Sequence, residues 1–582
     1  QKRIKKHCSI NIFWLLSCMV HNKNIRLLTN TKLERSERRA GNFDVILRKK
    51  PVYVDTQKCT SCGRCTSACP TVVPDEWNEG LINRKAIYKP FPQAVPSTYT
   101  LDDEHCIKCG ICTNVCPTNA IDLDAIDDII SLTVGSVVIA TGHQRFDTSK
   151  RPEYGHELYE DVLSQMELAR VMGVNGPTHG KLLVPSTGKV PRRVVMIQCV
   201  GSRDQLPGGH KYCSKVCCMV ALKSANLIRT HYPDTEVIIC YTDIRTPGVY
   251  EKYYKYGQDN GIELIRGRPG EIAREDDHMI VRIEDTLTGI REEIPTDLIV
   301  LSAALESSKG TIEVAKTLNV ALTEDNFIKE KHPKMKPVTT DIEGIFVCGT
   351  AQGPKDITDS IIQANAAATK ISELVNGGLE VEPFIASINV KKCVLCGSCV
   401  ENCVYQAITL NRNSIHVDAI SCTGCGDCII TCPQEAISIQ GQSDDKLEAS
   451  IRGILKNKKD DERIIIAFLD DIGNVSANNM GINRVSCPSS VRIINVPFIN
   501  RVKYRHVLYA LTHGADGVFI GEYPDTPKHK EIRENVNIMK KHLEEEGINP
   551  NRLIIHSVFI PYFRGLANQF KEFDEELRLN SY

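Results

Sequence analysis

The chain carries almost no excess charge of either sign, since its 71 lysines and arginines are balanced by 72 aspartates and glutamates. This balance argues against a nucleic-acid-binding protein and against a polybasic membrane anchor. Long apolar runs are also missing, and no stretch reaches transmembrane length. The 16 histidines form no i, i+4 pairs of the kind that bind metals on a helix. A chain of 582 residues that is 42% hydrophobic has the composition of a soluble globular protein with several domains.

The first twenty residues resemble part of a secretory signal peptide. Four basic residues among the first six precede an apolar run from Ile12 to Val20. This run is too short to span a membrane, and no small-residue cleavage site follows it. Because the chain opens on Gln1, we expect a truncated segment of a cytoplasmic protein rather than an exported one.

Cysteine, in contrast, is abundant: the chain has 25, and most of them stand in groups. Four groups share the spacing C-x2-C-x2-C-x3-C, which is the bacterial ferredoxin spacing. Three cysteines of such a run bind one [4Fe–4S] cluster and the fourth binds the neighbouring cluster, whereas zinc sites and disulfide scaffolds lack this spacing. The four predicted ligand sets are Cys59, Cys62, Cys65 and Cys116; Cys106, Cys109, Cys112 and Cys69; Cys393, Cys396, Cys399 and Cys432; and Cys422, Cys425, Cys428 and Cys403.

Two details of these runs concern the backbone. Each run contains a glycine, which is expected to let the backbone approach the cluster closely; these are Gly63, Gly110, Gly397 and Gly426. In the third run Val404 stands where the others have proline, a change that affects turn stiffness and not ligation.

Four further cysteines gather between a predicted strand and a predicted helix. Cys199 ends the strand, and Cys213, Cys217 and Cys218 crowd the first turns of the helix, where the positive end of the helix dipole favours thiolates. These four could hold a fifth cluster, or they could be buried thiols beside a chance doublet. The spacing alone does not choose between the two.

The segments around the cysteine runs predict a multidomain α/β fold. Expected strands include Asn24–Leu28, Phe43–Arg48, Ser136–Ala140, Arg193–Cys199, Glu236–Cys240 and Leu298–Ser302, and expected helices cover 215–230 and 355–375. The predicted pieces are residues 1–50, a ferredoxin module at 51–124, an α/β domain at 125–380, a second ferredoxin module at 385–440, a charged linker at 441–461 and a final α/β domain at 462–582.

Two apolar segments that are far apart in the sequence suggest a flavin site. Residues 135–142, ending in Thr141 and Gly142, and residues 344–351, ending in Gly349, Thr350 and Ala351, resemble strand-to-loop segments of flavoproteins with two dinucleotide domains. The helix after the second segment would direct its N-terminus at the cofactor. The chain has no G-x-G-x-x-G cradle for a pyrophosphate, and the loop after Cys199 lacks a nicotinamide fingerprint. Direct use of NAD(P)H is therefore not expected.

Together these segments resemble the iron–sulfur flavoprotein subunit of CoB–CoM heterodisulfide reductase. The resemblance covers residues 22–440 and rests on residues 53–55, 84–96, 198–204, 212–219 and 353–356. It implies a thioredoxin-reductase-like FAD domain with an inserted and a C-terminal diferredoxin module, and it implies a cluster on the four central cysteines. It also implies that residues 1–50 are a remnant of the N-terminal FAD region, that Gly353 and Asp356 contact the cofactor, and that Lys355 tunes the flavin.

Residues 462–582 resemble the delta subunit of methyl-viologen-reducing hydrogenase, which holds a [2Fe–2S] cluster. The corresponding segments here are 468–473, 497–501 and 521–525, and none of them contains a cysteine. Without soft donors this domain is not expected to bind a cluster, so we predict a scaffold or docking role. The five cysteines left over are expected to be thiols without a metal: Cys8, Cys18, Cys240, Cys348 and Cys487.

The function that the resemblance implies is electron transfer in methanogenesis. Electron pairs would enter at FAD and split between ferredoxin and a CoM-S-S-CoB-type disulfide. The implied partners are heterodisulfide reductase subunits B and C, a hydrogenase or formate dehydrogenase module, ferredoxin and a second copy of the chain. The alternative is a flavin-free polyferredoxin-like wire or scaffold, and a third hypothesis has a separate polypeptide complete the flavin site.

Overall fold

The structure is a computed structural model of the chain. It describes residues 19, 22–39, 42–92, 94, 96–275, 278–377, 385–403, 405–411, 413–419, 421–441, 443–459, 461–524 and 529–579. The predictions for Cys8, Cys18 and Val404 lie outside the described residues. The chain divides into two compact units, of which the first contains residues 1–37, 44–341 and 345–370 and the second contains 38–43, 342–344 and 371–582. Within the described ranges, no helix has the length and apolar character needed to cross a membrane.

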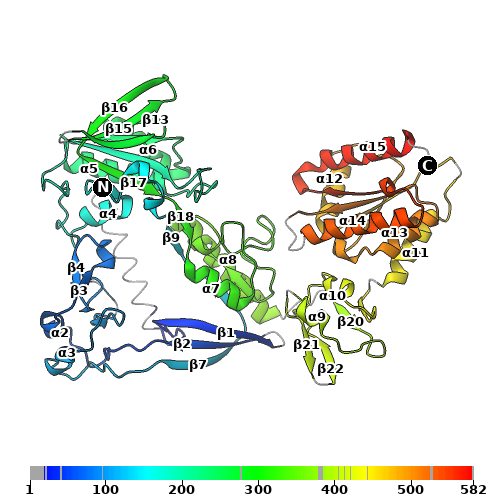
Figure 1. Ribbon diagram of the computed structural model, residues 1–582, viewed down its shortest axis with the longest axis horizontal. Coiled ribbons are helices and arrows are strands. Elements are labelled where there is room, and N and C mark those ends of the chain that lie inside the picture. Colours follow the sequence, from blue (N-terminus) through cyan, green and yellow to red (C-terminus); the bar gives the residue numbers. More distant parts are fainter. Residues whose placement is uncertain are drawn as a thin grey trace. The chain divides into compact units, whose positions relative to one another are not determined.

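A three-stranded sheet follows the N-terminal region, in the order β1 (Thr31–Arg39), β2 (Asn42–Lys49) and β7 (Asp128–Val134) (Figure 1). The strand predicted at Phe43–Arg48 is confirmed as part of β2. The strand predicted at Asn24–Leu28 is wrong, and the strand that pairs with β2 lies further along the chain, at Thr31–Arg39. That segment is charged and lacks the alternation of apolar and polar residues from which a strand is predicted. An ion pair links the two strands, since Arg48 Nη2 of β2 lies 2.6 Å from Glu34 Oε1 of β1.

The first ferredoxin module lies between β2 and β7 in the sequence. Backbone hydrogen bonds from Asp55 N to Ala120 O (2.8 Å) and from Asp122 N to Tyr53 O (2.9 Å) join its two ends. Its small core contains Val54 and Ile87 together with cysteine side chains. Its elements are α2 (Arg64–Ala68), β3 (Val72–Pro74), β4 (Asn83–Lys85), β5 (Ile87–Tyr88), β6 (Thr100–Leu101) and α3 (Ile111–Asn114).

A parallel five-stranded sheet forms the centre of the first unit, in the order β10-β17-β11-β12-β13. Met196 of β11 is in register with Ile239 of β12 and with Val300 of β17. The predicted strands and helix in this region are confirmed. The elements are β10 (Val162–Ser164), β11 (Arg193–Val200), β12 (Glu236–Tyr241), β13 (Glu263–Arg266) and β17 (Leu298–Ala303), with helices α4 (Gln165–Val171), α5 (Cys217–His231) and α6 (Glu251–Asp259).

Both faces of this sheet are buried, which explains why its strands are nearly continuous apolar runs. Val194 and Met196 pack with residues of α4 and α5 on one face. The alternating residues Val195 and Ile197 pack with residues of a three-stranded antiparallel sheet on the other. That second sheet consists of β14 (Glu271–Glu275), β15 (His278–Asp285) and β16 (Ile290–Thr296).

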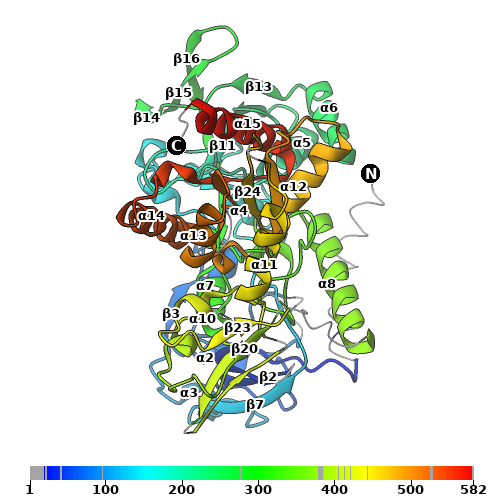
Figure 2. The same ribbon diagram turned by 90° about the vertical axis from the view of Figure 1, so that its right-hand side faces the viewer.

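Two short strands bring the predicted flavin segments together. β8 (Val137–Ile139) pairs in parallel with β19 (Ile345–Val347), with Val138 opposite Phe346. The long helix α8 (Ile357–Gly377), green in Figure 2, follows β19 and confirms the helix predicted there. The neighbouring elements are β9 (His143–Arg145), β18 (Leu305–Ser307) and α7 (Lys309–Leu318).

The second unit begins with another ferredoxin module. Its small core contains Ile408, Ile429 and Ile437 with cysteines of both runs. Its elements are β20 (Ala386–Ile388), α9 (Ser398–Glu401), β21 (Ile408–Asn411), β22 (Ser414–Val417), α10 (Asp427–Ile430) and β23 (Ile437–Ile439).

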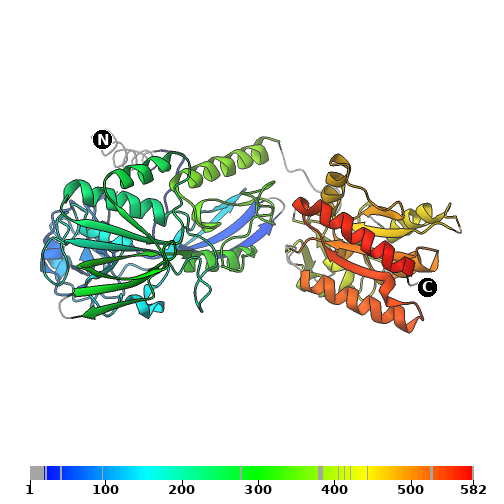
Figure 3. The same ribbon diagram turned by 90° about the horizontal axis from the view of Figure 1, so that it is seen from above.

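The C-terminal domain is a three-layer α/β structure around a parallel sheet of order β25-β24-β26-β27 (Figures 1 and 3). Residues of α12 and α15 pack on one face of this sheet, and residues of α11, α13 and α14 pack on the other. The elements are α11 (Asp444–Leu455), β24 (Ile465–Leu469), α12 (Asp471–Ile482), β25 (Val491–Asn495), α13 (Tyr504–Thr512), β26 (Gly517–Glu522), α14 (His529–Glu545), β27 (Leu553–Ser557) and α15 (Phe563–Leu579).

The prediction of a charged linker at 441–461 requires a correction. Most of this stretch is helix α11, and its Leu447 and Ile451 are buried in the core of the C-terminal domain. Charged residues occupy many other positions of the helix, so its average composition does not reveal the apolar stripe at helical spacing. The helix therefore belongs to the C-terminal domain.

Candidate metal centres and flavin site

Cysteines from different ferredoxin-type runs lie near one another. After burial, the neighbours that raise the pKa of Cys112 are Cys106, Cys109 and Cys69. In the second module, burial and then Cys393, Cys396 and Cys432 raise the pKa of Cys399. Both groups coincide with predicted ligand sets. For Cys428 the neighbours after burial include the other three members of its predicted set, Cys425, Cys422 and Cys403.

The glycines of the four runs adopt the backbone conformation that the predicted close approach requires. Gly63, Gly110, Gly397 and Gly426 have φ values of 81°, 74°, 83° and 85°, in the left-handed region that side chains with a Cβ rarely adopt. Each of them directly precedes one of the short helices that carry the third cysteine of a run.

Backbone N–H groups point at the fourth cysteines of three runs. Ala120 N donates to Cys116 Sγ, Ala407 N to Cys403 Sγ and Ala436 N to Cys432 Sγ, all at 3.3 Å. Such donors stabilise the thiolate form of a cysteine. Within the described ranges every cysteine is free of disulfides, and no three His, Cys, Asp or Glu side chains are arranged around a single metal ion. Grouped thiols with amide donors fit iron–sulfur clusters.

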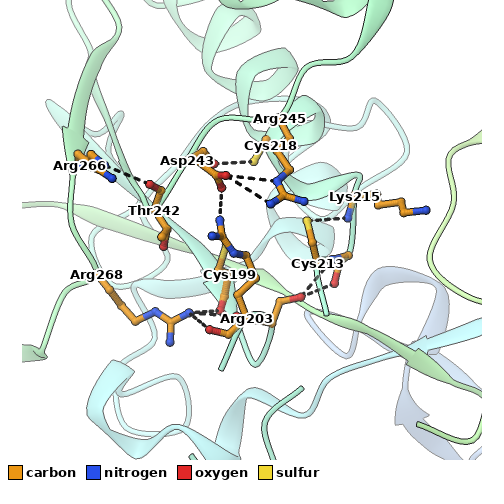
Figure 4. Close-up of polar contacts among 12 residues, drawn as sticks. Cys199, Arg203, Cys213, Lys215, Cys218, Thr242, Asp243, Arg245, Arg266 and Arg268 are labelled. Carbon is orange, nitrogen blue, oxygen red and sulfur yellow. Dashed lines mark hydrogen bonds and ion pairs between the residues drawn. The ribbon is translucent and has the colours of Figure 1, made fainter. Parts of the chain in front are cut away.

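The four central cysteines also lie together, and we call them the four-cysteine centre: Cys199, Cys213, Cys217 and Cys218. Cys199 lies at the C-terminal end of β11, and Cys217 and Cys218 begin α5 (Figure 4). Cys213 lies in the loop before α5 and not in its first turns, where the sequence had placed it. The Cys217 thiol hydrogen-bonds with both Cys199 and Cys218. Lys215 N donates to Cys213 Sγ at 3.3 Å. The structure thus brings Cys199, Cys217 and Cys218 into contact, and Cys213 lies in the same region (Figure 4).

Two thiols of this centre are shifted toward the thiolate form. The hydrogen bond from Cys217 lowers the pKa of Cys218 to about 7, and a backbone hydrogen bond and the charge of Arg245 act in the same direction. The pKa of Cys199 is also lowered, first by Cys217 and further by Arg203 and Arg268. The pKa of Cys217, which forms these hydrogen bonds, is raised. The environment therefore favours the thiolate, the form that binds metals, at Cys199 and Cys218.

The loop after Cys199 has an unusual backbone. Cys199, Gly201 and Arg203 have positive φ values of 62°, 76° and 51°. A Cβ at Gly201 would lie 2.4 Å from the Phe146 ring, so glycine is required there. Arg268 stabilises this loop, since its Nη2 donates to the carbonyl oxygens of Cys199, Ser202 and Arg203 at 3.3, 3.0 and 3.4 Å (Figure 4).

The two predicted flavin segments meet through the β8–β19 pair. His143 Nδ1 lies 3.1 Å from Thr350 Oγ1, and Thr141 Oγ1 lies 2.5 Å from Thr311 Oγ1. Gly142 has a φ of 75° and no atom within 4 Å of the position where a Cβ would stand, so its backbone is open to a ligand. Gly349 donates its N–H to Gln363 Oε1 at 3.0 Å. These residues fit one half of a flavin site.

The start of α8 contains the remaining predicted flavin residues. Lys355 Nζ donates to Gly353 O at 3.3 Å, and the carboxylate of Asp356 accepts the N–H of Asp359 at 2.7 Å and so caps the helix. Burial, and after it the charge of Lys215, lower the pKa of Lys355 to about 8. Lys215 therefore connects the predicted flavin residues with the four-cysteine centre.

Sequence reasoning missed the charged residues around the four-cysteine centre. Asp243 forms an ion pair with Arg203 and lies 3.4 Å from Arg245 Nη2. Arg245 and Arg268 follow β12 and β13, as Arg203 follows β11. In the sequence, each of these arginines stands shortly after a strand. A single arginine after a strand occurs in many proteins, so this position alone does not predict a role at a metal centre.

In the C-terminal domain, the segments without cysteines have structural contacts. Asp470 Oδ1 accepts the N–H of Gly473 at 2.7 Å and caps α12. The buried Glu522 accepts a hydrogen bond from Arg533 Nε at 2.6 Å. Asn500 Nδ2 donates to Asp427 Oδ1 of α10 at 2.6 Å, which connects the domain to the second ferredoxin module. None of these groups is a soft metal donor.

Three family models match the chain. Residues 58–121 and 392–436 each match a 4Fe-4S dicluster domain, and residues 465–579 match the delta subunit of methyl-viologen-reducing hydrogenase. The two dicluster matches cover the two ferredoxin modules, and the third covers the C-terminal sheet and its helices.

Two curated relatives are similar over most of the chain. One is a ferredoxin:CoB-CoM heterodisulfide reductase subunit of Methanosarcina acetivorans, 41% identical over 97% of this chain and 74% of that protein. Another is an H(2)/formate:CoB-CoM heterodisulfide,ferredoxin reductase subunit of Methanococcus maripaludis, 48% identical over 69% of this chain and 62% of that protein. Among solved structures, Lactococcus lactis thioredoxin reductase has a TM-score of 0.28 and 17% identity over 50% of this chain and 86% of that chain. This likeness is too weak to transfer a fold or a cofactor.

Proposed function

Because the chain belongs to the family of the iron–sulfur subunit of CoB–CoM heterodisulfide reductase represented by these relatives, we propose that it is the flavin- and iron–sulfur-containing subunit of such a complex. Membership makes the chain part of an oxidoreductase, and its two dicluster domains give it an electron-transfer role. The observation that supports the proposal most strongly is the grouping of cysteines from separate runs into sets of four.

The proposed cofactors are assigned to residues of both units. Four clusters belong to the sixteen ferredoxin-type cysteines and a fifth to the four-cysteine centre. We assign residues 125–380 to a thioredoxin-reductase-like flavoprotein domain, with Thr141, Gly142, Gly349–Ala351 and Gly353 on the FAD. Bound FAD would supply the exchange between two-electron and one-electron carriers. Lys355 would place its positive charge beside the flavin, and Asp356 would hold the start of α8.

The proposed reaction is electron bifurcation. A pair of electrons enters, one electron leaves toward ferredoxin, and the other leaves toward a CoM-S-S-CoB-type disulfide, whose two-electron reduction takes two such events. The relatives' names contain ferredoxin, formate and the heterodisulfide, which supports this choice of carriers. We further propose subunits B and C, a hydrogenase or formate dehydrogenase module and a second copy of the chain as partners, with the complex in the cytoplasm.

Iron and flavin analysis of anaerobically purified protein tests this function. Five [4Fe–4S] clusters predict about 20 iron atoms per chain, and the FAD assignment predicts one flavin. Full iron without flavin would instead support the flavin-free electron wire. Iron at or near zero would contradict both functions.

A further inference from the structure

We infer that Arg203, Arg245 and Arg268 raise the reduction potential of the four-cysteine centre and make it the most readily reduced iron–sulfur centre of the chain. This inference rests on the proposed assignment of a cluster to these cysteines. It goes beyond that assignment, because it gives the centre a role as the preferred acceptor of an electron.

The fold brings the three arginines to the same place. Arg203 follows β11, Arg245 follows β12 and Arg268 follows β13, and these strands are parallel neighbours in the central sheet. The carboxyl ends of parallel strands meet at one edge of a sheet, where α/β proteins bind ligands. Figure 4 shows the three arginines around Cys199, Cys213 and Cys218 at this edge.

Contacts hold the arginines beside the cysteines. Cys218 Sγ lies 3.8 Å from the carbonyl oxygen of Asp243, and the carboxylate of Asp243 forms ion pairs with Arg203 and Arg245. Arg268 Nη2 donates to Cys199 O at 3.3 Å. Three positive charges that come from separate loops therefore surround one group of thiols.

The nearby carboxylates do not cancel this charge. Asp243 forms ion pairs with Arg203 and Arg245. Asp204 Oδ2 lies 2.6 Å from Arg151 Nη2, and Asp204 Oδ1 lies 3.7 Å from Arg268 Nη1. Glu153 lines the pocket beside Cys199 and Arg268. Four arginines thus accompany three carboxylates around the centre, which leaves its surroundings positive.

The ferredoxin-type cysteines have a different environment. The basic residues within the first two runs, Arg64 and Lys108, are exposed to solvent. In the fourth run the buried carboxylate of Asp427 stands between Cys425 and Cys428. Reduction adds a negative charge to a cluster that already has four thiolate ligands, so positive neighbours stabilise the reduced form and raise the potential. Arginines should therefore favour reduction at the four-cysteine centre over the other clusters.

A reductive titration of the full chain, followed by electron paramagnetic resonance, tests this inference. Arg245 suits substitution because its side chain is 48% exposed. Arg245→Gln should lower the midpoint potential of the centre, Arg245→Lys should keep it, and Asp243→Asn should raise it. A tenfold change in the reduction equilibrium corresponds to about 59 mV for one electron, which is the expected order of each shift. Iron content should remain unchanged in all three variants.

Two controls separate this inference from the proposed function. Cys213→Ala should remove about four iron atoms and the signal that appears at the highest potential, whereas Cys240→Ala, at a buried cysteine of β12, should retain both. Arg266→Gln changes a neighbouring arginine that donates to Thr242 O and should leave the potential unchanged.

The outcomes differ for the two proposals. Full iron in Cys213→Ala would overturn the cluster assignment and the inference with it. Loss of four iron atoms in Cys213→Ala, together with an unchanged potential in Arg245→Gln, would overturn the inference alone. A ferredoxin-type cluster that is reduced before the four-cysteine centre would also overturn it.

Discussion

Two lysines connect the candidate sites of the first unit at the scale of single residues. Lys355, near the start of α8, has a pKa that burial and then the charge of Lys215 lower to about 8. Lys215 also gives its backbone N–H to Cys213 Sγ. A change of charge at the four-cysteine centre should therefore influence the protonation of the residue expected to tune the flavin.

We predict that Lys355 changes from charged to neutral as the pH rises through about 8. Competitive acetylation across pH 6.5–10, read by mass spectrometry of the Lys355 peptide, measures this transition because only the neutral amine reacts. In Lys215→Met the transition should move to higher pH, since a repelling charge is lost. Lys211→Met, on the same loop, serves as the control and should leave it in place. An identical transition in wild type and Lys215→Met would contradict the predicted coupling.

At the scale of elements, helix α11 is held to the C-terminal domain by both an apolar stripe and one carboxylate. Asp444 Oδ1 lies 2.6 Å from Arg501 Nη2, and its Oδ2 lies 2.9 Å from Lys503 Nζ. Burial would raise the pKa of Asp444, but hydrogen bonds from His506, Lys503 and Arg501 hold it well below its usual range. The carboxylate is thus charged at neutral pH, and it also lies in the first turn of α11, where the helix dipole favours a negative charge.

Asp444→Ala should loosen α11 and the start of α13. The side chain of Arg501 is only 3% exposed, and removing one partner of a buried ion pair typically costs about 3 kcal/mol. Amide hydrogen exchange in α11 and α13 should therefore become roughly a hundredfold faster. Asp445→Ala, at the exposed neighbouring position, provides the matched control and should have little effect. Equal exchange in the two variants would show that Asp444 does not hold the helix.

At the scale of the whole molecule, the proposed metal ligands all lie in the part of the chain between Cys59 and Cys432. The C-terminal domain keeps the sheet and helices of the hydrogenase delta match, but its segments serve as helix caps, a buried ion pair and a contact with α10. Its cysteine, Cys487, is exposed and lies before β25. A single thiol cannot replace the four soft ligands of a cluster.

From the proposed ligand assignment we predict that Cys487→Ser has the same iron content as the wild-type chain. Anaerobic purification followed by iron analysis measures this, and serine keeps the size and polarity of an exposed position. Cys425→Ser, within a ferredoxin-type run, is the positive control and should lose about four iron atoms. Loss of iron in Cys487→Ser would show that the C-terminal domain contributes to a metal site.

The sequence by itself determined the features that depend on local spacing. The cysteine runs predicted which residues gather, because the distance between ligands of one cluster is covered by two or three residues of chain. The apolar segments before Gly142 and Gly349 predicted strands, since short apolar runs rich in β-branched residues favour strands. β19 is buried throughout, whereas Val138 of β8 is 40% exposed. The helix predicted at 215–230 is observed at Cys217–His231, where apolar residues repeat at helical spacing.

Only the tertiary structure decided the features that depend on neighbours distant in the chain. The strand that pairs with β2 is charged and is linked to β2 by an ion pair. The apolar residues of α11 that enter the core are spaced among charged ones, so composition alone does not predict that the helix is buried. The arginines after β11, β12 and β13 are ordinary residues in the sequence, and they converge on the four cysteines because parallel strands end at the same edge of the sheet. Local spacing thus specified which ligands could gather, whereas the order of the strands decided which charges surround them.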